Sequence, residues 1–209
     1  MMHNFFKRIL SSVILIPLSF YFIYYGSYVL LFFTSICFFI SSYEWHMMTK
    51  KKNYNITGFI FLFFSFYTFY QCSNNLTLVF FVILICISTD IGGYIFGNVF
   101  KGPKLTKISP KKTYAGMIGS YLFSLISLFI ASKLYDYSFM NNKIFLLTII
   151  ISTVSQIGDL IISYFKRLSK VKDTGKIIPG HGGLLDRIDG MIFTFPIIFL
   201  IQLAGYLHI

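Results

Sequence analysis

The stretch SYFKRLSKVKDTGKIIPGHGGLLDRID, residues 163–189, separates two apolar runs and gathers much of the chain's polar chemistry. Its 27 residues hold six of the 18 Lys and Arg, three of the seven Asp and Glu, and four glycines. A charge cluster between two hydrophobic segments indicates a functional loop beside a membrane helix. Carboxylates, basic side chains and glycines in one loop suit a phosphorylated, metal-bound substrate.

Polar side chains at helical spacing begin just upstream of that stretch. Residues that lie four, seven and eight positions after Asp159 share its face of an α-helix, because each residue turns the helix by about 100°. These residues are Ser163, Lys166 and Arg167. Asp159 lies inside an apolar run, where a carboxylate costs about 2.5–3.5 kcal/mol on insertion scales and usually has a function. The alternative is a structural ion pair between Asp159 and a neighbouring lysine.

Two further elements complete the stretch. The glycines of residues 179–183 allow backbone N–H groups to approach phosphate oxygens closely. Asp186 and Asp189 are three residues apart and share a face if the segment is helical. Oxygen donors beside basic residues favour Mg²⁺, held jointly by protein and phosphates, over zinc. From the residues alone, we therefore predict phosphate and Mg²⁺ chemistry.

The complete pattern resembles the signature of a known enzyme family. It consists of Ser163-Tyr-Phe-Lys166-Arg167, Lys172-Asp173 and His181-Gly-Gly-Leu-Leu-Asp186-Arg-Ile-Asp189. This pattern is similar to that of the phosphatidate cytidylyltransferases, also called CDP-diacylglycerol synthases. The segment from Arg8 to Pro17 resembles the start of the same family, so the likeness covers nearly the whole chain.

A second block carries the same resemblance. It begins with Asp90 inside an apolar run and continues with the SPKKT sequence of residues 109–113. Many members of the family carry Glu where this chain has Ala115, and often Ala where it has Gly93. The departure at Ala115 removes an acid, which leaves the role of that Glu open here.

The resemblance implies a membrane enzyme that uses CTP, phosphatidic acid and Mg²⁺, and that releases CDP-diacylglycerol and pyrophosphate. The catalytic residues that we expect are Lys166, Arg167, Asp159 and Asp186. The substrate-binding residues that we expect are Ser163, Asp90, Lys111, Lys112, His181, Gly182, Gly183 and Arg187. The metal ligands that we expect are Asp159, Asp186 and Asp189; a second, monovalent metal ion is left open.

The composition places the chain among multispanning membrane proteins. It is 56% hydrophobic and 12% charged, with a mean hydropathy of +0.73. The net charge of +11 does not indicate nucleic acid binding, because the lysines cluster between apolar runs, where positive charge sets topology. Cys37, Cys72 and Cys86 have no disulfide or metal spacing. We expect one membrane domain over residues 1–209, in contact with the lipid bilayer.

Apolar runs predict an all-α bundle of about seven transmembrane helices. The predicted spans are Ile9–Tyr25, Tyr28–Ser42, Ile56–Tyr70, Leu76–Phe100, Met117–Leu134, Ile144–Phe165 and Met191–Leu207. The first run could be a signal peptide, but Pro17 interrupts it and no small-residue cleavage site follows, which favours an uncleaved span. With the amino end inside and the carboxyl end outside, sixteen of the 18 Lys and Arg face the cytoplasm. The motif loops then lie on the cytoplasmic side of the cell's inner (plasma) membrane.

Several alternatives stay open at this point. A sibling cytidylyltransferase acting on another lipid phosphate would carry the same motifs. A transporter would use the intramembrane acids Asp90 and Asp159 for ion passage, although the polar residues gather at one edge of the predicted bundle. His181 suits a general acid, a phosphate donor or a hydrogen bond that orders the loop. The oligomeric state is open too, a homodimer included.

Overall fold

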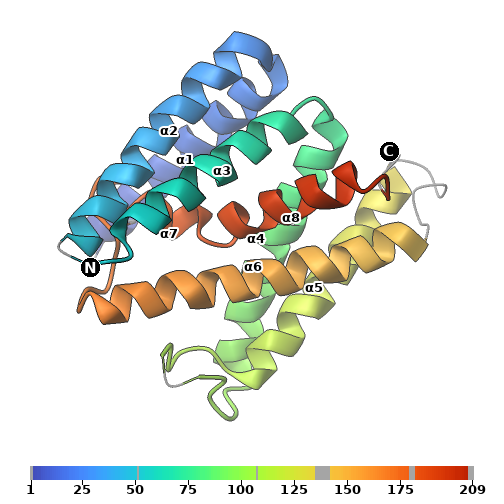
Figure 1. Cartoon of the computed structure of the whole chain (residues 1–209). Helices are drawn as coiled ribbons and strands as arrows, with labels where there is room; N and C mark the ends of the chain where they lie inside the picture. The colour runs from blue at the N-terminus through green and yellow to red at the C-terminus, as the bar shows by residue number, and fades with distance from the viewer. Residues whose placement is uncertain (1, 51, 107, 135–141, 179–181, 207–209) are drawn as a thin grey trace. The chain divides into compact units, whose positions relative to one another are not determined.

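The computed structural model describes residues 2–50, 52–106, 108–134, 142–178 and 182–206, and these form helices joined by loops (Figure 1). The helices are α1 (Met2–Tyr25), α2 (Ser27–Thr49), α3 (Asn55–Cys72), α4 (Leu76–Val99), α5 (Tyr114–Leu134), α6 (Asn142–Leu168), α7 (Leu185–Ile188) and α8 (Met191–Leu203). Within the described ranges, β structure is limited to isolated bridges. The predicted all-α fold is confirmed.

Each predicted span overlaps one of the helices. Four helices of the described chain are long and apolar enough to cross a membrane, namely α2, α4, α5 as far as Lys133, and α6. Shorter apolar helical segments are Val13–Tyr25 and Met191–Leu203. The class of polytopic membrane bundle is therefore confirmed, and the number of seven crossings stays a prediction. The predicted end of the second span at Ser42 is wrong, because α2 continues to Thr49.

The chain divides into two compact units, which are described separately. Unit 1 comprises Met1–Val79 and Phe165–Ile209, and unit 2 comprises Phe80–Tyr164. The segment between α6 and α7, residues 169–184, is called the signature loop and belongs to unit 1. Asp90, the SPKKT loop and Asp159 belong to unit 2.

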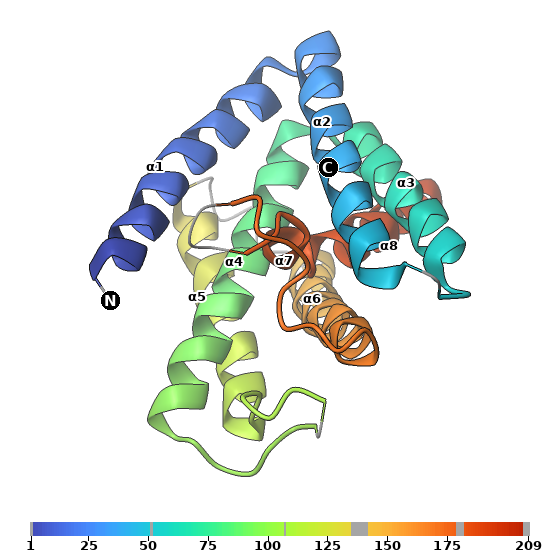
Figure 2. The ribbon, with the colours of Figure 1, turned by 90° about the vertical axis from the view of Figure 1, so that its left-hand side faces the viewer.

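In unit 1, helix α3 packs against both α2 and α8, and α2 and α3 lie side by side in both ribbon views (Figures 1 and 2). Aromatic rings pack at both contacts. Phe38 of α2 lies against Phe63 of α3. Phe69 of α3 lies against Phe195 of α8. Such pairs add to the dispersion energy that holds helices together in lipid. This packing positions α2, the helix that carries Glu44, a residue of the site described below.

In unit 2, α4 and α5 approach each other at glycines. A Cβ added at Gly92 would lie 2.3 Å from the carbonyl oxygen of Gly119, and one added at Gly116 would lie 2.9 Å from that of Gly93. Only hydrogen at these positions lets the two backbones come so close. The Ser120 hydroxyl also donates to the carbonyl oxygen of Thr89 at 2.8 Å, which ties α5 to α4.

Helix α6 joins this pair through hydroxyl groups. Thr89 of α4 donates to Ser152 of α6 at 3.1 Å, and Tyr121 of α5 lies 2.9 Å from the hydroxyl of Thr153. Hydroxyl groups inside a membrane bundle need such partners, because lipid offers none. Helices α4, α5 and α6 are therefore linked to one another by hydrogen bonds.

Candidate functional site

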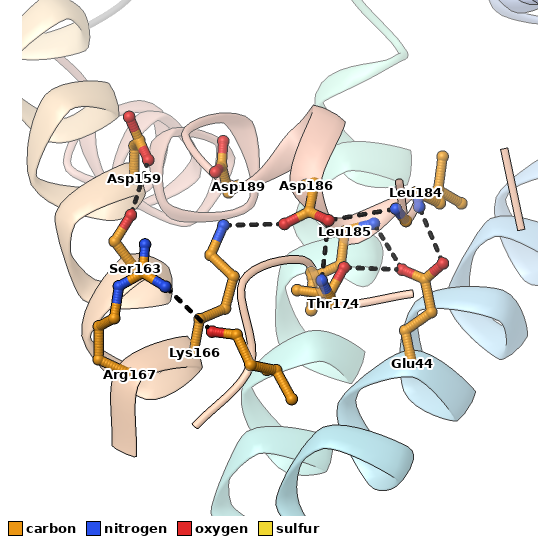
Figure 3. Close-up of polar contacts among 12 residues, drawn as sticks. Glu44, Asp159, Ser163, Lys166, Arg167, Thr174, Leu184, Leu185, Asp186 and Asp189 are labelled. Atoms are coloured by element: carbon orange, nitrogen blue, oxygen red, sulfur yellow. Dashed lines mark hydrogen bonds and ion pairs between the residues drawn. The ribbon is translucent and has the colours of Figure 1, made fainter. Parts of the chain in front are cut away.

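The signature loop of unit 1 is organised around an ion pair between Lys166 and Asp186 (Figure 3). Lys166 lies in the last turn of α6, and Asp186 lies in the first turn of α7. Lys166 Nζ donates to Asp186 Oδ1 at 2.8 Å, and both side chains are almost fully buried. The structure thus brings together two of the four predicted catalytic residues, which are 20 positions apart in the sequence.

The second oxygen of Asp186 accepts two backbone hydrogen bonds. The N–H of Thr174 donates to Oδ2 at 2.8 Å, and the N–H of Gly183 donates to it at 3.1 Å. Burial alone would raise the pKa of Asp186, but the hydrogen bond and charge of Lys166, together with the two N–H groups, hold that pKa below its ordinary value. Asp186 is therefore an ionised carboxylate at neutral pH, and it joins α6, the loop and α7.

Glu44 is a second carboxylate in this cluster, which the sequence analysis missed. It projects from α2 and accepts hydrogen bonds from the N–H groups of Leu184 and Leu185, both at 2.9 Å, and from the hydroxyl of Thr174 at 3.2 Å (Figure 3). The available signal was an acid beside an apolar run, in SSYEW. The predicted span ended at Ser42, two residues before Glu44, and no role was predicted for Glu44.

The remaining predicted residues of the loop have different environments. Arg167 donates from Nη1 to the carbonyl oxygen of Val171 at 3.1 Å, just after the end of α6. Gly182 has φ +84°, and a Cβ there would lie 3.1 Å from Asp186 Oδ2, so both conformation and space favour glycine. His181 lies outside the described residues.

Asp186 and Asp189, the two acids of the sequence Asp186-Arg-Ile-Asp189, lie on a continuous helical backbone. Helix α7 comprises Leu185–Ile188, and Asp189 follows with helical angles, φ −57° and ψ −36°. Asp186 and Asp189 therefore share a face, as their spacing predicted for a helical segment. Asp189 Oδ1 accepts the N–H of Gly190 at 2.9 Å. Arg187, between them, has its backbone N–H bonded to Leu184 O at 2.9 Å.

In unit 2, Asp159 forms an ion pair with Lys112. Ser163, one turn further along α6, donates its hydroxyl to Asp159 Oδ1 at 3.3 Å. The side chains of Asp159 and Lys112 are about a third and a quarter exposed, so the pair is only partly covered by the protein. The predicted face of α6 is thus real for Asp159 and Ser163. The predicted phosphate-binding residue Lys112 contacts the predicted metal ligand Asp159.

The SPKKT loop is held by its own backbone. The N–H of Leu105 donates to the carbonyl oxygen of Lys112 at 2.8 Å, and Thr113 Oγ1 accepts the N–H of Gly116 at 3.0 Å. Thr113 therefore caps the start of α5. Lys111, beside it, is exposed, and Asp90 lies in α4.

Asp159 in unit 2 and Asp186 in unit 1, each taken by itself, have carboxylate oxygens that suit Mg²⁺ bound together with substrate phosphates. Within the described ranges, no group of three His, Cys, Asp or Glu side chains could hold a metal ion by itself. Mg²⁺ commonly uses one or two carboxylates, with waters and phosphate oxygens completing the octahedron. The partly exposed carboxylate of Asp159, which already attracts the Lys112 cation, fits such a ligand. Asp186 has accepted three hydrogen bonds on about four lone-pair positions and retains capacity for one more partner.

Comparison with known proteins identifies the family. The model of the Cytidylyltransferase family matches residues 6–74 and 57–204. A phosphatidate cytidylyltransferase of Rickettsia felis is 36% identical over 214 residues, which cover 96% of this chain and 93% of the relative. That of Rickettsia prowazekii is 39% identical over 173 residues, covering 77% and 75%. That of Staphylococcus saprophyticus is 41% identical over 140 residues, covering 66% and 54%. The chain therefore belongs to the cytidylyltransferase family.

Proposed function

We propose that this protein is a phosphatidate cytidylyltransferase that converts CTP and phosphatidic acid into CDP-diacylglycerol and pyrophosphate. The observation that carries the proposal is the match to curated enzymes of that name, which extends over 96% of the chain in the Rickettsia felis relative. The buried Lys166–Asp186 pair and the partly exposed Lys112–Asp159 pair are consistent with phosphate chemistry. The alternative is that the acceptor is a lipid phosphate other than phosphatidic acid, and the assay below distinguishes the two acceptors.

The reaction that we propose forms one P–O bond and breaks another. A phosphate oxygen of phosphatidic acid attacks the α-phosphorus of CTP, and the bond to the pyrophosphate leaving group breaks. The protein contributes positioning and neutralisation of charge, without a covalent nucleophile. We assign phosphate neutralisation to Lys166, Arg167 and Arg187, of which the arginines offer bidentate contacts.

The other assignments concern the metal ion and substrate contacts. We assign Asp159 and Asp186 as Mg²⁺ ligands and Asp189 as a ligand or an orienting group, because hard cations prefer carboxylate oxygens. When bound, Mg²⁺ would neutralise charge on the phosphates and on the departing pyrophosphate. The residues that we assign to substrate binding are Ser163, Asp90, Lys111, Lys112, His181, Gly182, Gly183 and Arg187.

Release of pyrophosphate by the purified protein tests this function. We expect release that requires CTP, phosphatidic acid and Mg²⁺ together, and that stops when any one is omitted. Another lipid phosphate, such as an archaeal-type ether lipid, is supplied in a parallel reaction. Faster turnover of that lipid would assign the protein to the sibling activity. Absence of pyrophosphate release with every lipid phosphate would reject the enzyme and leave the transporter as the remaining proposal.

We also propose that the motif loops face the cytoplasm at the inner membrane, since sixteen of the 18 basic residues fall on one side of the predicted topology. Single cysteines are placed by Lys111→Cys, Lys176→Cys and Asn74→Cys, in a chain whose native cysteines are replaced by alanine. We expect an impermeant thiol reagent to label only Asn74→Cys from outside intact cells. Labelling of Lys176→Cys under these conditions would contradict the orientation.

A further inference from the structure

Glu44 is the most deeply buried acid among the described residues, and no step of the proposed reaction uses it. Glu44 is 1% exposed and lies in the last two turns of the candidate membrane span Ser27–Thr49. A buried carboxylate is costly unless hydrogen bonds or an opposite charge compensate it. Such a residue needs a physical reason for its presence, and its partners supply one.

Hydrogen-bond donors of the signature loop provide the compensation. Oε1 accepts the N–H of Leu184, and Oε2 accepts both the N–H of Leu185 and the hydroxyl of Thr174. Within the described residues, these three donors, and no basic side chain, hold Glu44. Both carboxylate oxygens therefore act as acceptors, and α2 is fixed to the loop before α7.

The same loop segment is held from its other side by Asp186. Thr174 donates its N–H to Asp186 and its hydroxyl to Glu44. The N–H of Gly183 points to Asp186, while that of the next residue, Leu184, points to Glu44. Two carboxylates thus bind neighbouring donors of the same loop, so a movement away from one changes the geometry at the other.

Two glycines show how closely the loop is fitted to Glu44. A Cβ at Gly175 would lie 2.6 Å from Glu44 Oε1, and one at Gly183 would lie 2.5 Å from Glu44 Oε2. Gly175 and Gly183 do not have positive φ angles, so space around the carboxylate is what favours glycine there. The second glycine of the HGG sequence is therefore explained by Glu44 and Thr174.

We propose that Glu44 is a positioning residue: through Thr174 and the Gly183–Leu185 backbone, it holds Asp186 in the orientation that faces Lys166. The consequence for turnover depends on the proposed cytidylyltransferase activity. The consequence for the loop does not, and it is measured without substrate.

Hydrogen–deuterium exchange of the full-length protein in detergent tests the loop. Glu44→Gln keeps the size of the side chain, but its NH₂ group must face at least one donor, Leu184 N–H in one orientation or Leu185 N–H in the other. We expect the amides of residues 183–185 and of Thr174 to exchange about tenfold faster or more, since hydrogen bonds to charged groups are strong. The control is Ser42→Ala, which removes a buried hydroxyl on the same helix that has no hydrogen-bond partner among the residues that the structure describes. Unchanged amide protection in Glu44→Gln would overturn the proposal.

A pair of variants at Thr174 tests positioning separately and serves if Glu44→Gln does not fold. Thr174→Val removes the hydroxyl at nearly constant shape, whereas Thr174→Ser keeps it. We expect kcat per folded protein to fall about tenfold in Thr174→Val and to recover in Thr174→Ser. Equal kcat in the two variants would overturn the positioning role. If the unaltered protein has no cytidylyltransferase activity, the proposed function fails, and the exchange rates alone decide whether Glu44 holds the loop.

Discussion

Asp186→Asn is expected to lower cytidylyl transfer at least about a hundredfold while the protein still reaches the membrane. The amide has one acceptor oxygen, whereas Asp186 accepts from Lys166 on one oxygen and from two backbone N–H groups on the other. In either orientation the NH₂ group therefore meets a donor. The buried Lys166 ammonium also loses its partner, a change that typically costs about 3–5 kcal/mol.

The measurement is pyrophosphate release per amount of membrane-inserted protein, with Asp136→Asn as a control that makes the same chemical change outside the motifs. The lowered pKa of Asp186 predicts the pH behaviour. The stabilisation of the folded protein by the ionised Asp186 is fully present above the ordinary carboxyl pKa. It is lost only as the pH falls through the lowered pKa. The ratio of activities should therefore stay constant across the neutral range. Activity of Asp186→Asn near that of the unaltered protein would remove Asp186 from the site.

Gly183→Ala is expected to have the second-largest effect, and the reason is steric. The added methyl carbon would lie 2.2 Å from Thr174 Oγ1 and 2.5 Å from Glu44 Oε2, distances that real side chains do not tolerate. Either the loop moves or both hydrogen-bonded groups do, and overpacking of this kind costs about 1–3 kcal/mol. We expect turnover to fall about tenfold or more, since the N–H of Gly183 also binds Asp186.

Activity and thermal stability in detergent are compared with those of Gly97→Ala. At Gly97, an added methyl carbon would have its nearest neighbour, Thr113 Oγ1, at an ordinary distance of 3.5 Å. The double variant Gly183→Ala, Thr174→Ala removes the nearest atom and should regain part of the lost stability. Full activity of Gly183→Ala would show that the loop is free to move away from Glu44.

The helices could be predicted from the sequence because long apolar runs have few ways to satisfy their backbone in a membrane. The predicted spans agree with the helices at most ends, for example Leu76–Phe100 with α4, Leu76–Val99. The end of α2 was missed because hydropathy falls at Tyr43 and Glu44, although the helix continues and buries Trp45 and Met48. Burial against neighbouring elements, which no single run reveals, determined that boundary.

The residues of the signature loop were predictable by type, but their partners were not. Spacing placed Asp159 and Ser163 on one face of α6, and their hydrogen bond agrees. The pairing of Lys166 with Asp186 joins residues across a loop whose path has no periodic signal. The donors to Glu44 are mainly backbone N–H groups, which every residue except proline carries, so no residue type could mark them.

The contact between Gly92 and Gly119 has a consequence for how this protein family can diverge. Lipid provides no hydrophobic force to bring helices together, so the close approach of α4 and α5 depends on positions that accept only hydrogen. Exposed neighbours such as Ile91 and Ile118 need only be apolar. Drift should therefore exchange the bulky residues freely and spare Gly92 and Gly119. Percentage identity then understates how much of the helix pair two members share.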